Sequence, residues 1–295
     1  MKVKLRVPAT SANLGPGFDT LGVALSLYNR FEFDTDCEGV AVSGCAPEFA
    51  GEDNLAVRAW RAVEALAGAR PSGLRLQIDA RVPVARGLGS SATLLAAGAA
   101  AANIALGRPL DDSALLTLIA GMEGHPDNVA PALLGGLRAS ILRDGRALSV
   151  EYPVHPSLGF CALVPDSEVS TAQARRALPP SVPLRDAART LSSLALLLRA
   201  LETGDAALLP WALDDRLHQP WRRKLIPDYD LAEASAKELG GALCISGSGS
   251  TLLCILPAAE VPSFAAAMQQ RLSGSPHGWR ALPLQADLSG TTEES

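Results

Sequence analysis

Hydrophobic and polar residues alternate along the first half of the chain with two different periods. Three stretches alternate with period two and are rich in β-branched or aromatic residues, which predicts strands at residues 2–7, 21–33 and 74–79. Three others carry apolar residues at helical spacing or are rich in alanine, which predicts helices at residues 54–67, 91–106 and 111–122. The third helix begins with Asp111 and Asp112, acidic residues that favour a helix N-terminus. The first half therefore mixes strands with helices.

The pattern changes near residue 150. Residues 158–165 and 242–257 are largely apolar and predict buried strands, while residues 187–202 and 231–239 predict helices. We place a boundary near residue 153, which gives an N-terminal domain at 1–153 and a C-terminal domain at 154–295. The last residues, 289–295 (SGTTEES), are expected to be a frayed tail.

Composition narrows the class of protein. The chain has 295 residues, 48% of them apolar and 19% charged, with a net charge of −5, which predicts a soluble globular protein without the electrostatic footprint of a nucleic-acid or membrane partner. Its longest uncharged run, residues 87–107, contains too short an apolar stretch for a membrane span and predicts a buried helix. The N-terminus lacks the features of a signal peptide, and the five cysteines include no CxxC pair. We expect a cytoplasmic protein with neither disulfides nor a zinc site.

Residues 10–19, TSANLGPGFD, join two predicted strands. The segment holds two glycines, a proline, Asn13 and Asp19, more special chemistry than a simple chain reversal requires. From these residues alone it is either a polar turn or a binding loop.

Residues 83–93, PVARGLGSSAT, form a glycine-rich loop that leads directly into a predicted helix. Glycines allow consecutive N–H groups to face one point, and a helix N-terminus adds partial positive charge, so the segment predicts a phosphate site. Ser90 or Ser91 could donate to phosphate or coordinate Mg²⁺. An ordinary capped helix would also explain an isolated GxG. The segment lacks the lysine of a P-loop, and although GLGSSA fits a dinucleotide-binding fingerprint, the acids about 20 residues on begin a helix instead of ending a strand.

Residues 123–136, EGHPDNVAPALLGG, close a predicted helix with Glu123, His125, Asp127 and Asn128. These side chains could bind a metal and a polar substrate together. Taken alone, they would also suit a helix end followed by a surface turn.

The three segments and a fourth, residues 240–256 (GGALCISGSGSTLLCIL), occur in this order along the chain, and together they resemble the GHMP kinase superfamily. Among its members the chain is most similar to the homoserine kinase family, from residue 3 to about residue 256. The resemblance implies an α+β fold with two lobes. The N-terminal lobe would be an α+β domain with a left-handed β-α-β crossover, the C-terminal lobe a ferredoxin-like α/β sandwich, and the active site would lie between them.

The resemblance also implies roles for matched positions. Residues similar to the loop that binds the ATP phosphates are Pro83, Val84, Ala85, Arg86, Gly87, Leu88, Gly89, Ser90, Ser91, Ala92 and Thr93. Asn54 is similar to a position on the adenine side, and Ser91 (or Ser90) and Glu123 resemble ligands of Mg²⁺. Positions similar to those of the homoserine pocket are Asn13, Asp19, His125, Asp127, Asn128, Thr171, Arg175 and Arg222. Arg222 is the one expected to hold the substrate carboxylate, because a guanidinium grips a carboxylate with two hydrogen bonds.

The chain departs from the family at two places. Ser250, in SGSGST, stands where the family commonly has proline, and Glu123 and His125 are closer together than in members with an insertion there. The implied reaction is transfer of the ATP γ-phosphoryl group to the hydroxyl of L-homoserine, giving O-phospho-L-homoserine in threonine biosynthesis, by a homodimer. Catalysis would rest on Ser91, Glu123, Asp127 and Asn128, with Asp127 as general base or, as we favour, no dedicated base because the transition state is loose. The rivals are a mevalonate- or shikimate-type kinase and a non-catalytic sensor of ATP and metabolite.

Overall fold

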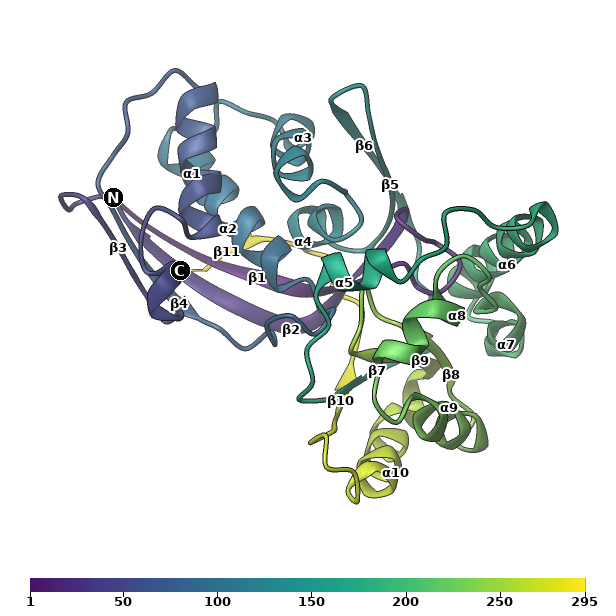
Figure 1. The fold of residues 1–295 in the computed structure, drawn as a ribbon. Coiled ribbons are helices and arrows are strands. Elements are labelled where there is room, and N and C mark those ends of the chain that lie inside the picture. Colours follow the sequence, from purple (N-terminus) through teal and green to yellow (C-terminus); the bar gives the residue numbers. More distant parts are fainter. Residues whose placement is uncertain (295) are drawn as a thin grey trace.

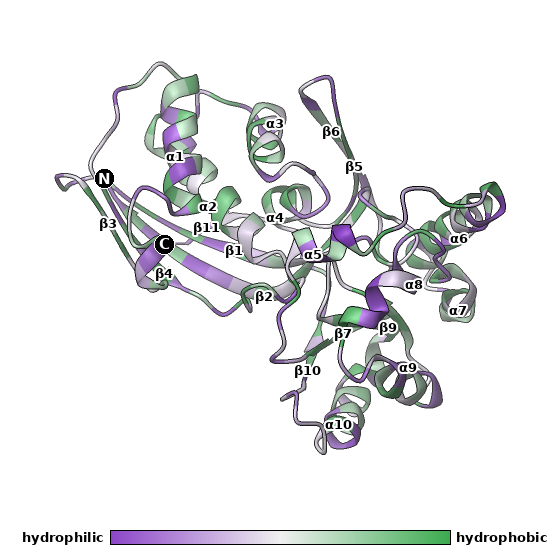
Figure 2. Ribbon diagram, viewed as in Figure 1, coloured by the Kyte–Doolittle hydropathy of each residue, from purple (hydrophilic) through white to green (hydrophobic). Residues whose placement is uncertain are grey.

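The computed structural model describes residues 1–294, which fold into two lobes, each built on its own sheet (Figure 1). The first sheet has seven strands in the order β11-β1-β2-β4-β3, with β5 pairing to β2 and β6 to β5. Their bounds are β1 Lys2–Ala12, β2 Leu21–Asp34, β3 Val40–Ser43, β4 Leu74–Asp79, β5 Leu137–Arg143, β6 Arg146–Tyr152 and β11 Thr292–Glu293. Figure 2 shows hydrophilic and hydrophobic residues following one another along β2, where Phe31 and Phe33 are buried and their neighbours are not.

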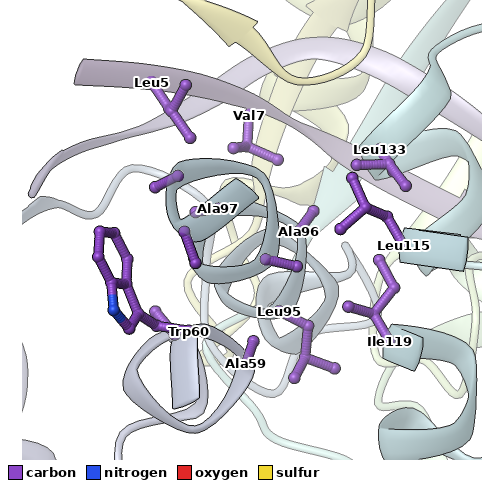
Figure 3. Packing of buried hydrophobic residues seen from close by; sticks show 14 of the residues in the cluster. Leu5, Val7, Ala59, Trp60, Leu95, Ala96, Ala97, Leu115, Ile119 and Leu133 are labelled. Atoms are coloured by element: carbon purple, nitrogen blue, oxygen red, sulfur yellow. The ribbon is translucent and has the colours of Figure 1, made fainter. Parts of the chain in front are cut away.

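Four helices pack on one face of this sheet and enclose the core of the lobe. They are α1 Leu55–Leu66, α2 Ser90–Ala105, α3 Asp112–Glu123 and α4 Val129–Leu134. Figure 3 shows α2 surrounded by side chains from α1, α3, α4 and β1. The alanines of α2 allow this because small side chains let neighbouring helices approach closely: a Cβ on Gly98 would lie 1.9 Å from the Ala56 carbonyl oxygen of α1. The run without charges is thus a buried helix, as expected.

The β-α-β unit of this lobe is β3-α1-β4, because β3 pairs with β4 in parallel and α1 lies between them in the chain. Strand β1 continues beyond the predicted end at Val7. The pairing of β1 with β2 shifts register between Pro8 and Ala9, so the proline, which has no N–H, falls at an irregularity in the ladder, and the strand then resumes to Ala12.

The second sheet is antiparallel, in the order β10-β7-β9-β8, the order of a ferredoxin-like domain. Its strands are β7 Leu158–Val164, β8 Ala242–Ile245, β9 Leu252–Pro257 and β10 Arg280–Leu284. The helices of this lobe are α5 Thr171–Arg176, α6 Leu184–Thr203, α7 Leu209–Ala212, α8 Gln219–Arg222, α9 Tyr229–Glu238 and α10 Val261–Leu272. Short 3-10 turns lie at Pro47–Phe49, Ala206–Leu208, Arg223–Leu225 and Ala258–Glu260. Strand β7 is buried on both faces.

The expectation of a frayed tail is wrong for residues 289–294. Strand β11 pairs with β1, Thr291 N–H donates to the Leu133 carbonyl, and Arg30 forms an ion pair with Glu294 at 3.1 Å. The chain returns to the first lobe here because Asp287 Oδ1 accepts hydrogen bonds from Ser289 N and Gly290 N and turns the backbone. In Figure 1 both ends of the chain lie beside the first sheet.

Two further expectations concern the whole chain. The five cysteines are free, and burial raises the pKa of Cys161 and Cys244 to about 12, so these two act as small apolar side chains. Among residues 1–294 no helix has the length and apolarity to cross a bilayer.

Candidate active site

The glycine-rich loop, residues 83–93, is held between β1 and the segment 246–251 that joins β8 to β9. Thr10 N donates to the Leu88 carbonyl, and Thr251 N donates to the Arg86 carbonyl, each at 3.1 Å. Gly87 has φ +76, and a Cβ there would fall 2.3 Å from the Ser246 carbonyl oxygen. Glycine is therefore required both for its backbone angle and for close approach. Segment 246–251 links two strands and also fixes the shape of this loop from the other lobe.

The two serines at the start of α2 have different surroundings. Ser91 Oγ donates to Glu123 Oε1 at 2.6 Å, which joins the first turn of α2 to the last residue of α3. The Ser90 carbonyl accepts from the Thr93 hydroxyl at 2.7 Å. Ser91 and Glu123 thus form a pair of hard oxygen donors at the positive end of a sixteen-residue helix.

Other residues of the loop have structural contacts. Arg86 Nε donates to the Pro165 carbonyl at 3.0 Å, and Nη1 lies 2.9 Å from Glu168, so this guanidinium holds the loop to the segment after β7. The side chains of Leu88, Ala92 and Thr93 are buried and pack inside the protein. Asn54, expected on the adenine side, caps α1: its Oδ1 accepts from Ala56 N and its Nδ2 donates to the Phe49 carbonyl. Its adenine role stays a prediction.

A cavity of about 430 Å³ lies beside the Ser91–Glu123 pair. Predicted residues from three separate segments line this cavity together. The lining residues are Asp19, Glu123, Gly124, His125, Pro126, Leu142, Thr171 and Arg175. Arg175 Nη1 and Nη2 donate to the two carboxylate oxygens of Asp19, both at 3.0 Å. Helix α5, which carries Thr171 and Arg175, begins where the Ser170 side chain accepts from Gln173 N. The fold therefore brings five of the predicted residues to one small polar cavity.

Asn13 is not among the residues that line the cavity, and both the oxygen and the nitrogen of its amide are engaged. Its Nδ2 donates to the Gly247 carbonyl at 2.8 Å, and its Oδ1 accepts from Asp19 N at 2.9 Å. Asn13 and Asp19 have φ values of 70° and 52°, in the left-handed region that asparagine and aspartate tolerate best. The structure thus gives Asn13 the task of shaping loop 10–19 and presenting Asp19, and its direct contact with substrate stays a prediction.

His125, Asp127 and Asn128 follow Glu123 around a tight turn. His125 Nδ1 donates to Asp127 Oδ1 at 2.6 Å, and this hydrogen bond raises the pKa of His125 above its usual value. Asp127 is buried. Asn128 Oδ1 accepts from the Thr10 hydroxyl at 2.8 Å, and the same Oδ1 would be 3.2 Å from a Cβ on Gly89, so this amide lies against the end of the glycine-rich loop.

Arg222 is buried and is not among the residues that line the cavity. Its Nη1 donates to the Gly247 carbonyl at 3.0 Å, and its guanidinium lies over the Phe18 ring at 5.1 Å. Burial lowers the pKa of this guanidinium, and among the described residues its Nε has no hydrogen-bond partner. Arg222 is therefore the one predicted arginine with an unfilled buried donor.

Reasoning from the sequence missed three residues of the site. Thr10 contacts Asn128, Phe18 stacks on His218 with ring centroids 5.2 Å apart, and His218 Nε2 donates to the Gly15 carbonyl at 2.8 Å. Thr10 and Phe18 lie inside segment 10–19, but which of their atoms meet other residues depends on contacts across more than a hundred residues of chain. Ser250, the departure from the family pattern, is buried and its hydroxyl donates to the Ser167 carbonyl, a bond that proline could not make.

A larger cavity of about 800 Å³ lies in the second lobe, among residues of α7, α8 and α9. Its lining contains none of the residues of loops 10–19, 83–93 or 123–128. Its charged side chains pair with one another, as Arg216 does with Asp214 at 3.2 Å and Arg223 with Glu233 at 3.4 Å. The smaller cavity is therefore the candidate active site.

Comparisons with known proteins show the family of the chain. The family model described as GHMP kinases N terminal domain matches residues 54–136, and the model described as GHMP kinases C terminal matches residues 194–274. A homoserine kinase of Clostridium botulinum (strain Kyoto) is 40% identical over 290 residues, which are 98% of this chain and 97% of that protein. A homoserine kinase of Gloeobacter violaceus is 48% identical over 262 residues, 85% of this chain and 86% of that protein.

Solved structures show the same fold. The homoserine kinase of Cytophaga hutchinsonii matches 99% of this chain and 97% of its own with a TM-score of 0.89 at 27% identity. The mevalonate kinase of L. major, in complex with R-mevalonate, matches 97% of this chain and 96% of its own with a TM-score of 0.75 at 16% identity, a likeness of fold alone.

Proposed function

Because the chain belongs to the GHMP kinases and, among them, to the homoserine kinase family, we propose that it transfers the γ-phosphoryl group of ATP to the side-chain hydroxyl of L-homoserine. The products are ADP and O-phospho-L-homoserine, and the reaction serves threonine biosynthesis. We also propose that the protein is cytoplasmic and forms a homodimer.

The observation that carries the proposal is the pairing of Asp19 with Arg175 at the wall of the cavity. Both side chains are partly exposed, 37% and 41%, so their ion pair contributes only about 0–1 kcal/mol and opens at little cost. An amino acid has an ammonium and a carboxylate, and it can replace this internal pair with two pairs of its own, Asp19 to the ammonium and an arginine to the carboxylate. A substrate that has a carboxylate but no ammonium offers Asp19 no partner in place of Arg175.

The residues near Ser91 fit Mg²⁺ and ATP. A hydroxyl and a carboxylate are 2.6 Å apart at a helix N-terminus, and Mg²⁺ typically takes one or two such protein ligands beside phosphate and water oxygens. Bound there, Mg²⁺ would neutralise charge on the transferring phosphates. Ser91 and Glu123 would hold it, and the N–H groups of residues 87–91 would face the phosphates.

The remaining groups position the acceptor. Asn128, beside Gly89, orients the homoserine hydroxyl, and an amide cannot take a proton. Asp127 is buried and is engaged by His125 at 2.6 Å, so we favour transfer without a dedicated base and a proton that leaves late. Acceleration then comes from positioning and charge neutralisation.

The test is ADP release in the presence of ATP and Mg²⁺ with L-homoserine, L-threonine, L-serine, mevalonate or shikimate as acceptor. We expect L-homoserine to give the highest kcat/KM, with ³¹P NMR showing a phosphate ester on its hydroxyl. Glu123→Gln keeps the shape of the side chain but removes its carboxylate, and it should lower kcat on the order of 100-fold. Absence of homoserine-dependent ADP would overturn the proposal: turnover of mevalonate or shikimate would indicate another small-molecule kinase, and binding without turnover a sensor.

A further inference from the structure

Thr10 is the residue of β1 whose side chain reaches Asn128. Its hydroxyl is completely buried and donates to Asn128 Oδ1 at 2.8 Å, across 118 residues of chain. Asn128 is half-buried, and within residues 1–294 its Nδ2 group donates to no protein acceptor. The Thr10 hydroxyl thus occupies the oxygen side of the amide and leaves the NH₂ side as its free donor.

Gly89 provides the room for this arrangement. A Cβ on Gly89 would lie 1.9 Å from Thr10 Oγ1 and 3.2 Å from Asn128 Oδ1, so the two side chains fill the space that a larger residue would take. Gly89 is also the N-cap of α2, with φ 68°. The Thr10–Asn128 hydrogen bond therefore lies directly against the point where the glycine-rich loop becomes a helix.

The side chain of Thr10 can be separated from its backbone role. The Thr10 N–H holds the Leu88 carbonyl at 3.1 Å and the strand pairing of Thr10 with Ala24 fixes the backbone, and neither contact uses the hydroxyl. An asparagine amide is roughly two-fold symmetric in shape and turns about its last torsion at low cost. Without a donor at Oδ1, the Asn128 amide could present either its oxygen or its nitrogen to the reacting groups.

We propose that Thr10 is a positioning residue that fixes the Asn128 amide in the orientation needed to hold the acceptor hydroxyl. The inference rests on the proposed role of Asn128 in phosphoryl transfer. Thr10 acts through Asn128 and not by contact with substrate or nucleotide. Loss of its hydroxyl should therefore lower kcat and leave the binding of ATP unchanged.

The test compares Thr10→Ala, which removes the hydroxyl, with Thr10→Ser, which keeps it. We expect T10A to lower kcat with homoserine roughly tenfold with KM for ATP within about twofold, the size of one lost neutral hydrogen bond, and T10S to stay near wild type. In an Asn128→Ala background, T10A should cause no further loss. Thr117→Ala, at a threonine whose hydroxyl accepts from Ala147 N away from the cavity, is the matched control and should keep wild-type kcat.

Three results would overturn the inference: T10A with wild-type kcat, T10S as impaired as T10A, or an equal further loss in the N128A background. If T10A does not fold, Thr10→Cys replaces it, since a thiol is a weaker donor of similar size, and T10C with wild-type kcat would likewise overturn it. A wild-type enzyme that is inactive on homoserine would refute the proposed function instead, so the two failures are distinguishable.

Discussion

The buried histidine His218 should make the folded protein sensitive to mild acid. His218 has no exposed surface, its Nε2–H donates to the Gly15 carbonyl at 2.8 Å, and its Nδ1 faces Arg222 Nη1 at 3.5 Å. A second proton would place an N–H on Nδ1 against the arginine. The pKa of His218 is lowered to about 4, mainly by burial. The positive charge of Arg222 also lowers this pKa. The Asp215 carboxylate, 3.6 Å from Nε2, raises it, as do the Gly15 carbonyl and Asp19.

The sign and size of the effect follow from linkage. In the unfolded chain a histidine has a pKa of about 6.5, so below that pH the unfolded state binds a proton that the folded state refuses. The stabilising contribution of neutral His218 is complete above pH 6.5 and is lost as the pH falls toward about 4. With these two values the loss between pH 7 and pH 5 is about 2 kcal/mol of unfolding free energy.

The measurement is urea unfolding at pH 7 and pH 5 for the wild type and for His218→Gln, which removes the titrating group and keeps a donor for the Gly15 carbonyl. The free energy of unfolding should fall by about 2 kcal/mol less in H218Q than in the wild type over this interval. His155→Gln, at an exposed histidine, controls for the loss of a histidine as such. Equal losses in the wild type and H218Q would refute the reasoning and mean that folding does not shift the pKa of His218, and a smaller loss in the wild type would mean that Asp215 keeps His218 protonated in the fold.

Three other changes test particular contacts. Arg175→Lys weakens the pair with Asp19 that the substrate ammonium must replace, so KM for homoserine should change by no more than about threefold in steady-state assays, with little change in Tm because the pair is partly exposed; a tenfold rise in KM would mean that Arg175, and not Arg222, holds the carboxylate. Gly87→Ala should lower the free energy of unfolding, measured in urea, by about 2 kcal/mol or more. Gly107→Ala, with φ +80 but open space around it, should lower it by only about 1 kcal/mol. Equal losses would contradict the close approach of Gly87 to the Ser246 carbonyl. Deletion of residues 289–295 should lower Tm by several degrees, whereas an unchanged Tm would mean that β11 contributes nothing.

Helices α1, α2, α3, α6 and α9 and strands β2 and β4 could be predicted because their patterns are local, whereas β5, β6 and α10 were not among the predictions. Residues 91–106 lack charges and the structure has α2 at Ser90–Ala105, and the β2 prediction ends one residue early. The tail could not be predicted in this way, since two residues of β11 are too few to show a period. What fixes them is the turn at Asp287 and the pairing with β1, which is almost the length of the chain away.

The motifs indicated which residues form the candidate site, but they did not indicate which groups the atoms of these residues contact. Asp19, Glu123, His125, Thr171 and Arg175 line one cavity, as the resemblance implied. Asn13 looked equally suited to substrate, yet its amide is engaged by Gly247, 234 residues away. Whether a polar side chain faces a ligand or a backbone group depends on such distant contacts, and no spacing within a motif encodes them.

The contacts of the Gly247 carbonyl bear on which of two arginines, Arg175 or Arg222, holds the substrate carboxylate. It accepts from both Asn13 Nδ2 and Arg222 Nη1, so the loop that presents Asp19 and the helix that presents Arg222 meet at one atom of the SGSGST segment. A buried N–H without a partner costs about 1–3 kcal/mol, and Arg222 Nε is such a group within the described residues. Arg175, in contrast, already has its hydrogen bonds to Asp19 and gains from a carboxylate only what it loses there. A carboxylate that reached Arg222 would fill an empty donor at no such loss. We therefore propose that Arg222 holds the substrate carboxylate and that Arg175 releases Asp19 to the ammonium.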